Sequence, residues 1–160
     1  MPQPDLVIFD CDGVLVDSEI IAARVEAELL TSAGYEISPE ELAETYAGLT
    51  FKDILMRVEE KSHLPFQASL IDRAEELVDR KLRSDVRIID GAREAVAAVT
   101  APRAVCSNSR TERIEFMLEK VRLLPFFAGR IFSGLDIPGK KTKPSASPAR
   151  GTAIAAMPTR

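Results

Sequence analysis

The sequence predicts an α/β fold in which a helical segment interrupts a parallel sheet. The continuous apolar run at residues 6–9 is typical of a strand buried on both faces, as in parallel sheets. The long segment after this run has helical apolar spacing. Alternation of helix and strand patterns resumes later, with strands expected at 104–106 and 130–133. We therefore expect an incomplete Rossmann-like parallel sheet core at 1–16 and 88–138, with an inserted α-helical cap subdomain at 17–87.

The first two helices of the predicted cap carry clear start and stop signals. The first begins near Ser18 and ends at Gly34, because glycine favours the left-handed conformation that follows a helix. The second begins after Ser38, whose hydroxyl caps the helix, while Pro39 takes the first helical position and Glu41 completes a capping box.

The remaining helices are expected from similar signals. The cap has a third helix that starts at Thr50 and a fourth over about 67–83. In the core, a short helix is expected at 92–99, and Ser109 is expected to cap a helix that ends near Val121.

Composition is that of a globular protein, with 46% hydrophobic and 29% charged residues in a chain of 160. The early apolar run is short and lacks a basic flank, so we expect no signal peptide, no membrane association and a cytoplasmic location. The net charge of −4 gives no reason to expect a nucleic-acid partner. Cys11 and Cys106 cannot build a disulfide framework and are interpreted as buried thiols. We expect a monomer.

The last 22 or so residues differ in kind from the rest. Residues 139–160 are rich in proline, alanine, serine and threonine, show no apolar period, and contain no acidic residue. Their basic residues are Lys140, Lys141, Lys143, Arg150 and Arg160. We expect this segment to be an irregular, disordered tail.

Polar clusters follow two of the predicted strands. Asp10 and Asp12 come directly after the first strand, and Ser107, Asn108 and Ser109 follow the second. Ligands of open α/β sheets bind at the carboxyl ends of the strands. If the two strands are neighbours, the clusters should therefore meet at one site.

Two aspartates separated by one residue suit phosphoryl transfer. Asp10 can attack phosphorus to form an aspartyl phosphate, and Asp12 is placed to protonate the leaving oxygen and then to activate water. Gly13 allows a sharp turn that aims backbone amides at the phosphate. Because these carboxylates repel an anionic substrate, we expect Mg²⁺ at Asp10 and Asp12.

The string FDCDGVLVDSE at residues 9–19 resembles the first signature of the haloacid dehalogenase superfamily. It is most similar to the branch with a helical cap inserted after this motif, which includes phosphoglycolate phosphatases and β-phosphoglucomutases. The string VCSNS at 105–109 resembles the second signature, which implies that Ser107 and Asn108 hold phosphate. Lys143, which precedes a proline, resembles the lysine of the third signature and would neutralise phosphate and nucleophile.

The resemblance implies hydrolysis of a small phosphate monoester, either a sugar phosphate or a phosphoglycolate-like molecule. Dehalogenases of the superfamily lack an acid two residues after the nucleophile, so Asp12 favours phosphate esters. A phosphosugar mutase similar to β-phosphoglucomutase is the alternative. Gly48, Thr50 and Lys52 occupy the place of a substrate-specificity loop in related caps, although a helix end followed by a helix cap explains them as well.

The family pattern continues with a fourth strand and an acidic pair that completes the Mg²⁺ site, whereas the sequence has no acid after Asp136. This break suggests a truncation or a frameshift. The first strand would then become a sheet edge, and the core of about 67 residues would be only marginally stable. We therefore expect impaired Mg²⁺ binding and little activity. The alternative hypothesis, from a different functional class, is that the chain is a catalytically inactive fragment.

Overall fold

The computed structural model describes residues 4–66, 68–127, 129–136 and 152–155. The chain divides into two compact units, which are treated separately below. One consists of residues 1–17 and 86–160 and contains the sheet, and the other consists of residues 18–85 and is helical.

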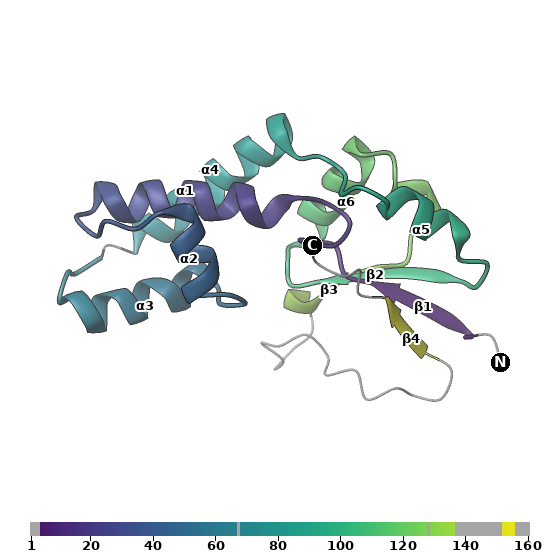
Figure 1. Ribbon diagram of the computed structural model, residues 1–160, viewed down its shortest axis with the longest axis horizontal. Coiled ribbons are helices and arrows are strands. Elements are labelled where there is room, and N and C mark those ends of the chain that lie inside the picture. Colours follow the sequence, from purple (N-terminus) through teal and green to yellow (C-terminus); the bar gives the residue numbers. More distant parts are fainter. Residues whose placement is uncertain (1–3, 67, 128, 137–151, 156–160) are drawn as a thin grey trace. The chain divides into compact units, whose positions relative to one another are not determined.

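The sheet unit contains four parallel strands in the order β3-β2-β1-β4 (Figure 1). Their bounds are β1 (Leu6–Phe9), β2 (Arg103–Ser107), β3 (Ile131–Ser133) and β4 (Thr152–Ala155). The predicted α/β class with a parallel sheet is confirmed. The neighbouring strands β1, β2 and β3 follow one another in the chain, as is usual for consecutive strands of a sheet.

The prediction that β1 forms a sheet edge is wrong. Strand β4 pairs with β1 in parallel, in a register that runs from Leu6 opposite Thr152 to Phe9 opposite Ala155. Residues 152–155 are therefore a strand, not part of an irregular tail. The physical reason is that an apolar edge strand leaves a row of backbone N–H and C=O groups without partners, and a fourth strand satisfies them.

The helices of the sheet unit are α5 (Ala92–Ala98) and α6 (Thr111–Lys120), with 3₁₀ turns η1 (Leu124–Phe127) and η2 (Gly134–Asp136). Figure 1 shows α5 and α6 on the same side of the sheet. Phe9 of β1 is buried and packs edge-to-face on Phe127, with ring centroids 5.9 Å apart. Leu6 and Ile8 are only half-buried, unlike the strand predicted to be buried on both faces, because both crossover helices cover one face.

The helical unit packs four helices around its own apolar cluster. They are α1 (Ser18–Ser32), α2 (Pro39–Thr45), α3 (Phe51–Ser62) and α4 (Ser69–Asp85). Ser38 caps α2 as predicted, since its hydroxyl accepts from the Glu41 amide at 3.1 Å. The cluster comprises Ala23, Ala27, Leu30, Ile37, Leu42, Tyr46, Ile54, Leu55 and Val58. Within the described part of the chain, no helix combines the length and the apolar character needed to cross a membrane.

Helix α3 is capped by Thr50. Its hydroxyl accepts from the Asp53 amide at 3.2 Å and donates to the Asp53 carboxylate at 2.7 Å. Thr50→Ala should lower the free energy of unfolding by about 1 kcal/mol, because both contacts are lost. Urea unfolding followed by circular dichroism would measure the change. Thr50→Ser keeps the hydroxyl and is the matched control, so an equal loss in both variants would contradict the capping role.

The two linkers to the helical insert run side by side within the sheet unit. Val16 and Ile88 form an antiparallel bridge, and the Ile89 amide donates to the Leu15 carbonyl at 3.0 Å. The Arg87 amide also donates to the Asp17 carboxylate at 2.7 Å. These contacts hold the start and the end of the insert together although about 70 residues lie between them in sequence.

Candidate active site at the carboxyl edge of the sheet

The polar clusters that follow β1 and β2 meet, as predicted. Strands β1 and β2 are paired neighbours, so their carboxyl ends lie at the same edge of the sheet. The Ser107 hydroxyl donates a hydrogen bond to Oδ2 of Asp12, and the Ser109 hydroxyl donates to the same oxygen at 3.0 Å. One carboxylate oxygen of Asp12 therefore accepts hydrogen bonds from the hydroxyl groups of two residues of the second cluster.

A tight turn after β1 keeps both aspartates at this edge. The Cys11 carbonyl accepts from the amides of Leu15 at 2.9 Å and Val16 at 3.2 Å, which reverses the chain. Gly13 has φ 71°, a left-handed conformation that glycine adopts without strain. Oδ1 of Asp10 accepts from the Cys11 amide at 2.9 Å, so the turn also orients the first carboxylate.

Cys11 lies between the two aspartates in sequence and is fully buried. Burial raises the pKa of its thiol, and the negative charges of Asp12 and Asp10 raise it further. The sulfur therefore stays protonated at neutral pH and is a poor nucleophile. This confirms the prediction of a buried thiol for Cys11, whereas Cys106 is only half-buried. It leaves the two carboxylates as the reactive groups of the turn.

Ser109 has a different role from the one predicted. The cap position of α6 is Arg110, with no side-chain capping hydrogen bond, and the Ser109 hydroxyl contacts Asp12 instead. The Ser109 amide donates to the Ser107 hydroxyl oxygen at 3.0 Å, which forms a local turn. This turn shifts the start of α6 beyond Ser109. The position of Ser109 in a polar cluster at a strand end was the sequence signal for a site residue.

Asn108 lies between these two serines and is exposed. A Cβ atom at Gly134 would lie 2.6 Å from Oδ1 of Asn108, closer than real contacts allow. Gly134 therefore leaves room for the Asn108 side chain in the position that it adopts here. The phosphate-binding role expected for Asn108 stays a prediction.

The other predicted site residues lie elsewhere. Lys143 is outside the described residues. Gly48, Thr50 and Lys52 belong to the helical unit, where all three are exposed. Gly48 has φ 77° and Thr50 caps α3, so local structure explains both. Their proposed part in substrate specificity stays a prediction.

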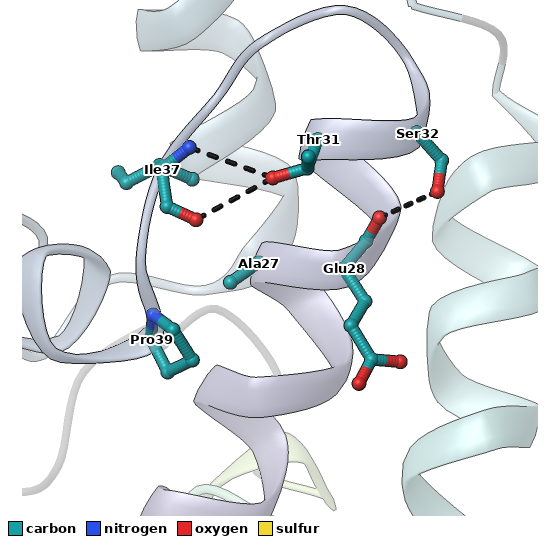
Figure 2. Close-up of a pocket in the computed structure, with 6 residues that line it drawn as sticks. All are labelled: Ala27, Glu28, Thr31, Ser32, Ile37 and Pro39. Carbon is teal, nitrogen blue, oxygen red and sulfur yellow. Dashed lines mark hydrogen bonds between the residues drawn. The ribbon is translucent and has the colours of Figure 1, made fainter.

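The helical unit also has a surface pocket of about 360 Å³, lined by Ala27, Glu28, Thr31, Ser32, Ile37 and Pro39. Figure 2 shows that the Thr31 hydroxyl contacts both the amide and the carbonyl of Ile37, while the Ser32 hydroxyl donates to the Glu28 carbonyl at 2.7 Å. The Thr31 hydroxyl stabilises the turn after α1, and the Ser32 hydroxyl bonds within the last turn of α1 itself. We assign no catalytic role to the pocket.

The donor set at the sheet edge fits a minimal magnesium site. Mg²⁺ in proteins is commonly held by one or two carboxylates, with water and substrate phosphate completing the coordination. Asp10 and Asp12 supply two carboxylates. The described residues contain no cluster of three or more acidic, histidine or cysteine side chains that could hold a metal ion.

Comparison with known proteins identifies the family. Residues 7–152 match the model of the haloacid dehalogenase-like hydrolases. The chain is 32% identical over 148 residues to 6-phosphogluconate phosphatase from Escherichia coli, covering 91% of this chain and 66% of that protein.

Solved structures agree with this match. A conserved haloacid dehalogenase-like protein of unknown function from Agrobacterium tumefaciens is 54% identical with a TM-score of 0.81, over 88% of this chain and 63% of that one. A family hydrolase from Deinococcus radiodurans with bound phosphate and sodium is 29% identical with a TM-score of 0.64, over 82% and 58%. The chain thus spans about two thirds of the length of these relatives or less. From the family match and the shared fold, it belongs to the haloacid dehalogenase-like hydrolases.

Proposed function

We propose that the chain carries the site of a phosphatase that acts on small phosphate monoesters through an aspartyl phosphate. The observation that carries the proposal is the hydrogen bond from the Ser107 hydroxyl to the Asp12 carboxylate. It joins the acidic pair after β1 to the hydroxyl cluster after β2, so a nucleophile, an acid and a phosphate-binding hydroxyl are available at one edge of the sheet.

The residues perform two consecutive substitutions at phosphorus. An oxygen of Asp10 forms a bond to phosphorus while the ester P–O bond breaks, and Asp12 gives its proton to the leaving alcohol oxygen. Asp12, now a carboxylate, takes a proton from water as the water oxygen attacks phosphorus and the bond to Asp10 breaks. The products are the alcohol, inorganic phosphate and the original enzyme.

Asp10 and Asp12 would hold Mg²⁺ at this edge, with Ser107, Asn108 and Lys143 on the phosphate. When bound, the ion supplies positive charge that offsets the repulsion between carboxylate and phosphate. With Asp10 and Asp12 as its two proposed carboxylate ligands, we expect the ion to bind weakly and turnover to be impaired.

The substrate is proposed to be a sugar phosphate or a phosphoglycolate-like molecule. The Escherichia coli relative is named as a 6-phosphogluconate phosphatase, which makes this sugar-acid phosphate the first compound to test. Its carboxylate and hydroxyl groups also distinguish it from a generic aryl phosphate.

The test is phosphate release from 6-phosphogluconate and from p-nitrophenyl phosphate over a Mg²⁺ series, with EDTA as the blank. We expect slow release that reaches half its maximum only at millimolar Mg²⁺. Release that is unchanged by EDTA would contradict a magnesium-assisted site, and rapid release at micromolar Mg²⁺ would contradict the impairment. A hexose 1-phosphate is tested in parallel, because its conversion to the 6-phosphate without phosphate release would identify a mutase.

A further inference from the structure

Serines end two neighbouring strands and make the same pair of contacts. Ser107 of β2 and Ser133 of β3 are register partners. Each hydroxyl oxygen accepts from the amide two residues later, that of Ser109 at 3.0 Å and that of Leu135 at 3.1 Å. Each hydroxyl also donates toward the next strand, Ser107 to Asp12 and Ser133 to the Ser109 carbonyl at 2.8 Å.

These contacts form a continuous series from β3 to Asp12. Ser133 is only 3% exposed, so its hydroxyl depends on protein partners, and burying it without them would be unfavourable. It fixes the carbonyl of Ser109, whose own hydroxyl donates to Asp12 at 3.0 Å.

Ser107 cannot serve Asp12 and a phosphate group at once. A serine hydroxyl has a single hydrogen to donate, and in this structure Ser107 donates it to Asp12. If Ser107 turns toward a bound phosphate, Asp12 loses that donor. Ser109 donates to the same carboxylate oxygen and would then keep Asp12 in place.

We propose that Ser109 is a positioning residue that keeps the Asp12 carboxylate in its catalytic orientation while Ser107 binds phosphate, and that Ser133 positions Ser109. The inference rests on the proposed function, because it gives Asp12 the role of acid and base. A general acid acts only within hydrogen-bond reach of the leaving oxygen, so a carboxylate that rotates away loses catalytic power.

The first test needs no turnover and measures the Asp12 side-chain rotamer by three-bond NMR couplings in the full chain. Ser107→Ala imitates the loss of the Ser107 donor, and we expect Asp12 to keep one rotamer in it. In Ser107→Ala/Ser109→Ala we expect the Asp12 side chain to average between rotamers. In Ser107→Ala/Ser133→Ala we expect partial averaging of the same side chain. Ser107→Ala/Ser109→Thr keeps a hydroxyl at 109 and should restore the single rotamer.

Two results would overturn the inference. One is rotamer averaging in Ser107→Ala alone, and the other is a single rotamer in Ser107→Ala/Ser109→Ala. The proposed role of Ser133 in positioning Ser109 is contradicted if the Asp12 rotamer distribution in Ser107→Ala/Ser133→Ala equals that in Ser107→Ala. Amide spectra of α6 show whether each variant is folded. For any variant that is not, Ser109→Thr and Ser109→Ala in the parent chain replace it, measured with saturating inorganic phosphate so that Ser107 is engaged by the phosphate; a single Asp12 rotamer in Ser109→Ala would then overturn the inference.

A second measurement separates positioning from simple destabilisation. In Ser109→Ala, kcat for phosphate release should fall about tenfold or more with KM unchanged, because ground-state binding does not involve Ser109. Ser109→Thr should recover most of kcat. A rise in KM with constant kcat would contradict the inference. The proposed function is contradicted by a different result, namely turnover that survives the loss of Asp10. The NMR measurement does not depend on turnover, so the two hypotheses can fail separately.

Discussion

Asp10→Asn should abolish formation of a phosphorylated chain and lower turnover by at least about 10³-fold, the scale expected when a covalent nucleophile is lost. The amide is nearly the same size as the carboxylate, and its oxygen still accepts a hydrogen bond, so the turn at Cys11 should persist. The measurement is intact mass after incubation with acetyl phosphate and Mg²⁺. The parent chain should gain one phosphoryl group slowly, as an oxygen of Asp10 displaces acetate.

Asp12→Asn is the matched control for this experiment. Acetate leaves without a proton, so this variant should still be phosphorylated, and it should retain the phosphoryl group longer because no base activates water. Phosphorylation of Asp10→Asn to the level of the parent chain would show that another residue is the nucleophile, and the proposed mechanism would then be wrong.

Phe127→Ala should destabilise the sheet unit by about 3–5 kcal/mol, the range for removing a buried aromatic side chain. Phe127 is fully buried and its ring meets Phe9 at an interplanar angle of 71°, an edge-to-face pair that adds to the loss. Small domains are stable by only about 5–15 kcal/mol. A loss of this size should therefore leave a substantial unfolded fraction of the unit.

Phe132 on β3 provides the control, since it is 55% exposed. Phe132→Ala should change the free energy of unfolding by no more than about 0.5 kcal/mol. Hydrogen exchange of the β1 and β2 amides reports on the sheet unit directly. Both Tyr35 and Tyr46 lie in the helical unit, so tyrosine fluorescence reports on that unit alone. Equal protection of β1 and β2 in the two variants would contradict the packing described for Phe127.

Local signals in the sequence predicted much of the fold. The Ser38 and Thr50 caps depend on residues three positions apart, and the structure has both. The strand end at Asp10 and the cluster at Ser107 were also recognisable, because a buried strand followed by polar residues is a local pattern. The meeting of the two clusters then follows from the pairing of adjacent parallel strands.

Non-local contacts were harder to predict. Strand β4 is four residues long and follows a segment without apolar period, so only its pairing with β1 distinguishes it from a loop. Ser109 matched a helix cap in sequence, but the alternative partner, Asp12, is distant along the chain. In both cases a contact with a residue distant in sequence outweighed the local pattern. Sequence periodicity carries no information about such distant partners.

The paired linkers at Val16 and Ile88 have a consequence for how such chains diversify. The insert leaves and re-enters the sheet unit through two adjacent backbone segments. A hydrogen bond from the Arg87 amide to the Asp17 carboxylate joins them. A different insert whose ends lie equally close could be grafted there without disturbing strand registry. The inserted segment can therefore be replaced during evolution while the positions of Asp10 and Asp12 before it are retained.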